Sequence, residues 1–336
     1  MFDPHKRIPM ARRIDWESQI GRRLKLRDLH VFSTVARCGS MAKAAQQLSV
    51  SQPAVSEIIA DLEHALGVRL LDRHPQGIEP TIYGDAVLKR STAVFDELKQ
   101  SIRDVEFLAD PTTGEIRIGC VESLSATIVP QIALRFSQQY PRVVVSVDDL
   151  TAPAIDLPGL RERKYDCLLV RLVTPLPDYP LADDLNAELL FDDRLVVAAG
   201  INSRWARRRK IELAELVDEP WILAPPGSWH HVCVAEAFRA RGLGSPKASM
   251  ISLSVTLKTQ LMAAGPYISV FGSSVMRLNA HRYNITVLPI ELPIRPWPVV
   301  LMTLNNRTLS PVVERFIACA REVAKSFAVR PQARRR

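Results

Sequence analysis

The chain has 336 residues, 47% of them hydrophobic and 24% charged, and a formal net charge of +8. This length provides for two or three domains, and no apolar run reaches the roughly 18 residues that a membrane-spanning helix requires. The basic N-terminal residues are followed by no apolar segment of the kind found in secretory signals, so we expect neither a membrane protein nor an exported one, but a cytoplasmic protein.

The excess positive charge lies at the two ends of the chain. Residues 1–27 carry a net charge of +5 and residues 330–336 carry +4, which leaves residues 28–329 at −1. We predict a basic flexible arm at 1–24 and a basic tail at 329–336. Either segment can help to bind a polyanion; the alternative is that both are disordered and serve only solubility.

The segment after the arm predicts three helices. Residues 40–59 (SMAKAAQQLSVSQPAVSEII) form two short helices joined by a tight turn, with Ser40 capping the first and Ser51 the second. Pro53 is tolerated in the first turn of the second helix, because a backbone N–H there has no intrahelical partner. The preceding helix packs over this pair through a face made of Leu26, Leu29, Phe32, Val35 and Ala36.

The start of the second short helix carries polar side chains on its outer face. Gln52, Ser56 and Glu57 remain outside when Val55 and Ile59 point inward. A helix-turn-helix presents side chains to the DNA major groove at this place. The alternative is an ordinary helical pair, since two short amphipathic helices occur in many domains.

Two short strands follow the second helix, which is predicted to end at Gly67. Residues 68–72 predict a strand, HPQG at 74–77 a turn, and residues 78–81 a returning strand. A helix, a helix-turn-helix and a two-stranded ribbon together make a winged helix. We therefore predict a DNA-binding domain at 25–84.

Residues 44–73 carry the long ungapped pattern AAxxLxxSQPAxSxxIxxLExxLGxxLxxR, and here the chain resembles the LysR-type transcriptional regulators. The resemblance implies a regulator whose partner is double-stranded DNA.

Glu57 departs from the family pattern, which often has arginine at this position. A carboxylate near a phosphate is unfavourable, so we expect Glu57 to accept from a cytosine amine or to turn away from the DNA. The predicted DNA-contacting residues are Ser40, Lys43, Ser51, Gln52, Pro53, Ser56 and Arg73.

A long linker helix is predicted at 81–110, with Thr81 as its cap. Seven of its residues follow alternating spacings of four and three, a pattern typical of a coiled-coil seam. The alternative is an ordinary helix that lies on its own domain, but a reader of DNA half-sites gains from two-fold symmetry. The resemblance implies a homodimer through this helix and a homotetramer. The seam comprises Val87, Ser91, Val94, Leu98, Ser101, Val105 and Leu108, and its five apolar members are the predicted dimer contacts.

Strands and helices alternate after a hinge at 110–114, which predicts an α/β region at 115–328 with parallel sheets covered by helices. We expect two doubly wound subdomains, the first at 115–188 and 290–328 and the second at 193–285. The segments GEIRIG (114–119), KYDCLLV (164–170) and AAGPYISVFGSS (263–274), and the helix at 130–141, resemble the effector-binding half of LysR-type regulators, which is similar to periplasmic binding proteins. Strands are predicted at 115–121, 143–147, 167–170, 195–199, 221–223, 268–270, 286–290 and 299–304, and helices at 128–139, 157–163 and 311–328.

A small-molecule effector is expected outside the carboxyl ends of these strands, where doubly wound sheets bind ligands. The resemblance favours Ser123, Thr151 and Ser228, because matching positions line the cleft in the family. Trp229 and Arg171 suit a hydroxylated ring or an aromatic acid, whereas Glu122 argues against a simple anion site. For each residue alone, helix capping or a solvated rim is the alternative. The predicted effector contacts are Glu122, Ser123, Thr151, Arg171, Ser228, Trp229 and Phe271.

The sequence has none of the motifs that mark catalysis or cofactor binding. It contains no GxSxG, P-loop or GxGxxG pattern. Its five scattered cysteines form no CxxC pair, and the adjacent His230 and His231 do not suit a common metal ion. We therefore predict no catalytic residues, cofactor or metal, and an effector-responsive regulator of transcription. The alternatives are a stand-alone binding protein of the periplasmic type and, less favoured, an α/β enzyme.

Overall fold

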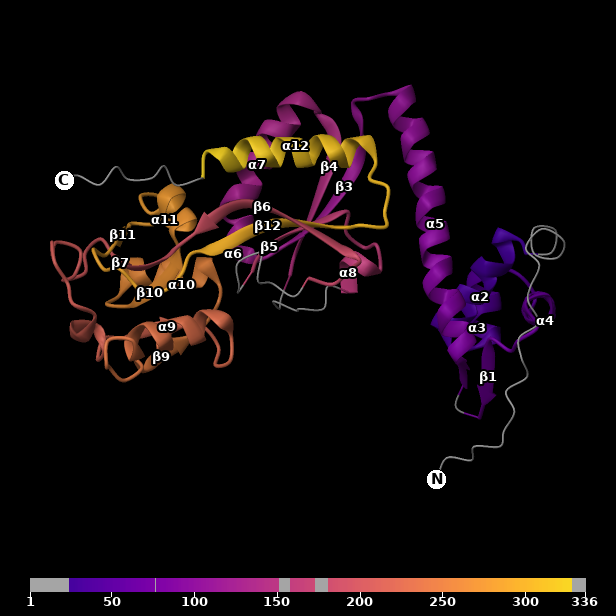
Figure 1. The fold of residues 1–336 in the computed structure, drawn as a ribbon, viewed down its shortest axis with the longest axis horizontal. Helices are drawn as coiled ribbons and strands as arrows, with labels where there is room; N and C mark the ends of the chain where they lie inside the picture. The colour runs from indigo at the N-terminus through magenta and orange to yellow at the C-terminus, as the bar shows by residue number, and fades with distance from the viewer. Residues whose placement is uncertain (1–23, 76, 151–157, 173–180, 328–336) are drawn as a thin grey trace. The chain divides into compact units, whose positions relative to one another are not determined.

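A computed structural model describes residues 24–75, 77–150, 158–172 and 181–327 of the chain. Its contacts divide the chain into two compact units, Met1–Lys99 and Gln100–Arg336 (Figure 1). The predicted tail and, apart from Leu24, the predicted arm lie outside the described residues. No helix within the described ranges is long and apolar enough to cross a membrane.

The N-terminal unit begins with the three predicted helices, α2 (Leu26–Cys38), α3 (Met41–Leu48) and α4 (Gln52–Leu66). Both predicted caps are confirmed: Ser40 Oγ accepts from Lys43 N and Ser51 Oγ from Ala54 N, each at 3.4 Å. The helices enclose a core that excludes water from their contacts. Its fully buried members are Phe32, Val35, Ala44, Val55 and Leu70.

The strands of the ribbon are shifted from their predicted positions, and His74 and Gly77 of the predicted turn lie within them. Strand β1 (Leu71–His74) pairs antiparallel with β2 (Gly77–Pro80). The first strand starts at Leu71 instead of residue 68, since the Glu63 carboxylate accepts from the N–H of Leu70 at 2.7 Å and holds this segment against α4. Residue 76 of the predicted turn lies outside the described residues.

Helix α5 (Ile82–Ala109) follows the ribbon, and Thr81 caps it as predicted, accepting from Gly84 N at 3.1 Å. Gly84 has to be small, because a Cβ there would lie 2.1 Å from the carbonyl oxygen of Leu70. This contact fixes the start of the helix against the winged helix.

The first two positions of the predicted seam of α5 are less accessible than the later ones. Val87 is half-buried against the core of the N-terminal unit and Ser91 is buried. Ile102, which the heptad pattern omits, is 59% exposed. The apolar side chains that remain exposed in the second half of the helix are Val94, Leu98, Ile102, Val105 and Leu108.

The C-terminal unit has two lobes, each with a sheet of five strands. Lobe I comprises the sheet β4-β3-β5-β12-β6 with helices α6, α7, α8 and α12. Helices α7 and α12 cover one face and α8 the other (Figure 1). The elements are β3 (Thr113–Cys120), α6 (Glu122–Ser125), α7 (Ile128–Gln139), β4 (Arg142–Asp149), α8 (Pro158–Arg161), β5 (Cys167–Arg171), β6 (Leu185–Asp193), β12 (Trp297–Leu304) and α12 (Pro311–Lys325).

Lobe II comprises the sheet β11-β7-β10-β8-β9 and the helices packed on it. A core with Trp221 and Phe238 forms on the side of α9, and a second core with Met262 and Val275 forms on the side of α10 and α11. The elements are β7 (Leu195–Gly200), η3 (Leu213–Leu216), β8 (Trp221–Leu223), α9 (Trp229–Arg239), β9 (Ala248–Ile251), α10 (Val255–Ala264), β10 (Ile268–Gly272), α11 (Ser273–Asn279) and β11 (Ile285–Val287).

The expectation of parallel sheets holds for part of each sheet only, because both sheets are mixed. In lobe I, β3 pairs parallel with β4 and β5, whereas β12 is antiparallel to both β5 and β6. The physical reason is the double crossover. Strand β6 leads out of lobe I and β12 leads back in, so these neighbours run in opposite directions; β7 and β11 are antiparallel in lobe II for the same reason.

Candidate functional site

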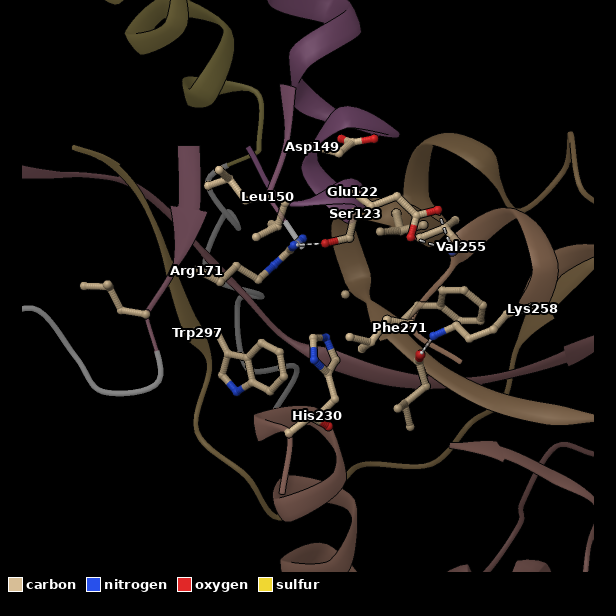
Figure 2. Close-up of a pocket in the computed structure, with 17 residues that line it drawn as sticks. Glu122, Ser123, Asp149, Leu150, Arg171, His230, Val255, Lys258, Phe271 and Trp297 are labelled. Carbon is tan, nitrogen blue, oxygen red and sulfur yellow. Dashed lines mark hydrogen bonds between the residues drawn. The ribbon is translucent and has the colours of Figure 1, made fainter. Parts of the chain in front are cut away.

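A cavity of about 280 Å³ lies between the two lobes at the carboxyl end of β5 (Figure 2). Strands β3, β4 and β5 end on the lobe I side, while α9, α10 and β10 face them from lobe II. Most of its wall is apolar, which suits a ligand with a hydrocarbon body. The apolar lining consists of Val121, Leu150, Leu172, Leu253, Val255, Val270, Phe271, Val275 and Trp297.

Arg171 stands at the centre of a buried polar group on one side of the cavity. It lies at the end of β5 and pairs with Asp193 at 2.9 Å, with the two side chains only 7% and 2% exposed. Its guanidinium donates to Ser123 Oγ (Figure 2). It also donates to Ser274 Oγ at 3.3 Å. The Ser123 hydroxyl is therefore an acceptor for arginine and is not placed as a nucleophile beside a general base.

Asp193 ties this group to lobe II. Its carboxylate accepts from Ser274 N at 3.0 Å, Ser274 Oγ at 2.6 Å and Ser273 Oγ at 2.8 Å, all at the start of α11. Burial raises the pKa of Asp193, but Arg171 and the Ser274 hydrogen bonds outweigh that effect and hold the pKa below its usual value. The carboxylate is therefore ionised at neutral pH.

Glu122 makes a second link between the lobes. From α6 of lobe I, its carboxylate accepts from Val255 N at 2.9 and 3.0 Å (Figure 2). It also accepts from Ser254 Oγ at 3.2 Å. Ser254 and Val255 form the N-terminus of α10, where unpaired N–H groups and the helix dipole favour a negative charge. The protein therefore supplies its own carboxylate at this end of α10.

Lys258 brings a buried cation to the wall of the cavity. Its Nζ donates to Val270 O at 2.8 Å and lies 4.0 Å from the centroid of the Phe271 ring. Burial lowers the pKa of Lys258 to about 8, and Glu122 opposes that shift. The side chain therefore remains mostly charged at neutral pH.

His230 lies against the opposite wall, with its ring 4.9 Å from that of Trp297 in an edge-on arrangement (Figure 2). Burial lowers its pKa to about 3, and the charges of Lys258 and Arg171 add to this effect. His230 is therefore neutral at physiological pH. Among the described residues, no cluster of histidine, cysteine and carboxylate side chains is arranged to hold a metal ion.

The structure brings five of the predicted effector contacts together around the cavity: Glu122, Ser123, Arg171, Ser228 and Phe271. Ser228 also caps α9, accepting from His231 N at 3.4 Å. Thr151 and the side chain of Trp229 lie outside the described part of the chain. Whether any of the five contacts an effector stays a prediction.

Sequence reasoning missed Lys258, Asp193 and the lining role of Trp297. A signal for Lys258 was present, since Val255, Lys258, Thr259 and Met262 follow the spacing of a buried helical face, and a lysine within such a face is unusual. Asp193 carried no such signal, because its partners are up to 81 residues away in the chain.

Most of the predicted DNA-contacting residues of the N-terminal unit are exposed. Gln52, Pro53 and Glu57 are exposed at the start of α4, and Ser56 is half-buried. Lys43 on α3 and Arg73 on β1 are exposed as well. Ser40 and Ser51 use their hydroxyl oxygens as helix-cap acceptors, and the exposed amide of Gln52 carries both a donor and an acceptor for a base edge.

Comparisons with known proteins cover both units. A family model described as the LysR substrate binding domain matches residues 109–325, and a model described as a bacterial regulatory helix-turn-helix protein of the lysR family matches residues 26–85. The HTH-type transcriptional regulator GbpR of Azospirillum brasilense is 27% identical over 300 residues, covering 89% of this chain and 86% of that protein. The HTH-type transcriptional activator CmpR of Synechocystis sp. is 29% identical over 303 residues, covering 87% and 93%.

Solved structures show the same fold. Full-length CbnR in complex with its target DNA matches with a TM-score of 0.59 and 22% identity, covering 89% of this chain and 100% of that chain. A full-length OxyR variant from Pseudomonas aeruginosa matches with a TM-score of 0.60 and 19% identity, covering 90% and 95%.

Proposed function

Because the chain belongs to the LysR family of bacterial helix-turn-helix transcriptional regulators, we propose that a small molecule bound between lobes I and II changes how the protein binds promoter DNA. The observation that carries this proposal is the cavity itself. It is lined from both lobes, and Glu122 and Asp193 already link those lobes through hydrogen bonds. A ligand at this place can change the angle between the lobes only by binding one arrangement more tightly than another.

DNA recognition is assigned to α4. Gln52 is exposed at its first position and can pair with adenine through two hydrogen bonds. Pro53, Ser56, Lys43 and Arg73 supply the surrounding contacts. Glu57 is also exposed, which fits acceptance from a cytosine amine better than a contact to phosphate.

Self-association is assigned to the second half of α5. Val94, Leu98 and Val105 leave an apolar stripe on this helix, and a stripe of this kind is stabilised by burial against a partner helix. A homodimer formed this way provides two copies of α4 for two DNA half-sites. A homotetramer requires further contacts between C-terminal units.

The winged helix argues against a stand-alone binding protein, and the use of Ser123 as an arginine acceptor argues against an enzyme of the serine-nucleophile type. We infer a regulator without catalytic activity. Its place of action is the cytoplasm, where bacterial promoter DNA lies.

The test combines ligand screening with footprinting on the DNA upstream of the protein's own gene. A library of small acids, sugars, amines and neutral aromatics is screened by thermal shift, since a ligand of the native state raises its melting temperature. Each binder is then added to the footprint. Wild type should show a ligand-dependent change, and Ser123→Ala and Ser228→Ala should weaken it while ligand-free DNA binding is retained.

Ser137→Ala is the matched control, because Ser137 is an exposed serine on α7 away from the cavity lining. It should behave as wild type. If no compound changes the footprint, or if both cavity variants keep the full change, the cavity is not the sensor.

A further inference from the structure

Lys258 has few partners for a buried ammonium group. Within the described part of the chain, its contacts are one hydrogen bond to Val270 O and the face of the Phe271 ring. An ammonium carries three N–H donors, so two donors are left for another acceptor. The cavity that Lys258 lines is the space from which such an acceptor can come.

Two other positive features of the cavity are already matched by the protein's own carboxylates. Arg171 pairs with Asp193 at 2.9 Å. The N-terminus of α10 is capped by Glu122, with hydrogen bonds of 2.9 and 3.0 Å to Val255 N. Lys258 differs from both, because no described carboxylate forms an ion pair with it.

The groups around Lys258 leave its ammonium mostly protonated at neutral pH. Its helix, α10, packs against β7, β10 and β11, and none of these strands carries a titratable side chain. Among the described groups, the Glu122 carboxylate acts on the charge of Lys258, and the charges of Lys258 and Arg171 both act on His230. With a pKa of about 3 His230 is neutral, and with a pKa of about 8 Lys258 is mostly protonated at pH 7.

We propose that the effector is a small monocarboxylic acid with an apolar body, and that Lys258 binds its carboxylate. The inference rests on the function proposed above and names the chemical class of the ligand. A carboxylate accepts charge-assisted hydrogen bonds from the free donors of Lys258, and these bonds are strengthened where water is excluded. The apolar body packs against the hydrophobic wall, which includes Val121, Leu150 and Trp297.

The same wall selects against a second negative charge. Glu122 and Asp149 also line the cavity, and Asp149 accepts from Ser125 Oγ at 2.6 Å. A dicarboxylate would place its second group near one of these like charges, in a site with no further unpaired cation among its described lining residues. Monocarboxylates should therefore bind more tightly than dicarboxylates of similar length.

The experiment measures the dissociation constants of benzoate, phenylacetate and hexanoate by calorimetry on the full chain, each beside its primary amide. The amide keeps the shape and removes the charge. At least one acid should bind wild type about tenfold or more tightly than its amide, since loss of one charge-assisted contact has this size. Adipate, a dicarboxylate with the same chain length as hexanoate, should bind less tightly than hexanoate.

Two substitutions separate charge from shape. Lys258→Met removes a buried charge but retains most of the side-chain volume, so the fold should be kept, and the preference for acid over amide should vanish. In wild type, acid affinity should fall about tenfold between pH 7 and pH 9, because the ammonium is titrated in this range. Lys258→Arg stays protonated, and any acid affinity it retains should be flat over the same range.

Each contrary result has a definite meaning. Equal affinity of acids and their amides for wild type, or an unchanged acid preference in Lys258→Met, would overturn the role of Lys258. Failure of all the acids to bind while another compound class changes the DNA footprint would refute the ligand class and leave the proposed function standing. If no compound of any class changes the footprint, both fail.

Discussion

Glu122 and Val255 join the two lobes of the C-terminal unit: the carboxylate of the first accepts from the backbone N–H of the second at 2.9 and 3.0 Å. Glu122 belongs to α6 of lobe I and Val255 starts α10 of lobe II. Asn279 adds another link between the lobes, donating to Ala126 O at 3.0 Å. These polar contacts contribute to the relative position of the lobes, and a ligand between the lobes can strengthen or displace them.

Glu122→Ala should loosen this link. Removing a carboxylate that caps a helix N-terminus costs about 0.5–2 kcal/mol, and the lobes should open more often. The free energy of unfolding of the C-terminal unit and the radius of gyration from solution scattering measure the two effects. Glu291→Ala, at an exposed site, is the control. An unchanged stability and radius in Glu122→Ala would show that the contact does not hold the lobes.

Asp193→Asn should destabilise the C-terminal unit at neutral pH by about 3–5 kcal/mol, because it leaves the buried Arg171 without its counter-charge. The pKa of Asp193 is lower in the folded state than in the unfolded state. The ionised carboxylate therefore contributes fully to the free energy of unfolding above the unfolded pKa of about 3.9. This contribution is lost as the pH falls through the folded-state pKa. The difference in the free energy of unfolding between wild type and Asp193→Asn should therefore become smaller below about pH 4.

Denaturant unfolding at several pH values checks this expectation. Asp148→Asn serves as the matched control, because the Asp148–Lys164 pair is largely exposed and solvent screens it. If the stability difference between wild type and Asp193→Asn stays constant down to pH 3, the lowered folded-state pKa of Asp193 is contradicted.

Gln52→Ala should weaken binding to the specific promoter site by about 1–3 kcal/mol and leave binding to random DNA nearly unchanged, since base contacts specify sequence whereas phosphate contacts do not. Gel shifts on both DNAs at one salt concentration measure the difference. Gln46→Ala tests an exposed glutamine on α3 that is outside the predicted contact set. Equal losses on both DNAs would show that Gln52 only positions the protein on the phosphate backbone.

The double substitution Val94→Glu with Leu98→Glu should prevent dimer formation and tight promoter binding, because it places like charges where two apolar stripes are expected to meet. Sedimentation gives the oligomeric state. Lys99→Glu is the control: the residue adjoins Leu98 in sequence, but successive helical residues point about 100° apart, so it lies off the stripe. Wild-type sedimentation of the double variant would refute this interface.

Local patterns predicted much of the secondary structure. Helix α7 was predicted at its observed bounds, 128–139, and the caps Ser40, Ser51 and Thr81 form the expected hydrogen bonds. Such features depend on residues a few positions apart, so the sequence displays them directly. Strand β6 was missed because polar and charged residues interrupt its apolar pattern, and β9 was missed because it has only four residues.

The sequence by itself determined the DNA-binding half, because a helix-turn-helix is built from contacts within one short segment. It also determined that strands and helices alternate in the second half. Only the tertiary structure decided the rest: that Val87 packs inward, that both sheets are mixed, and that Glu122 and Asp193 meet helices of lobe II. Those two carboxylates lie up to 133 residues from their partners, and Lys258 lines the cavity only because α10 packs against lobe II's sheet. Residue spacing along the chain does not reveal these contacts, because they form only when the chain passes from one lobe to the other.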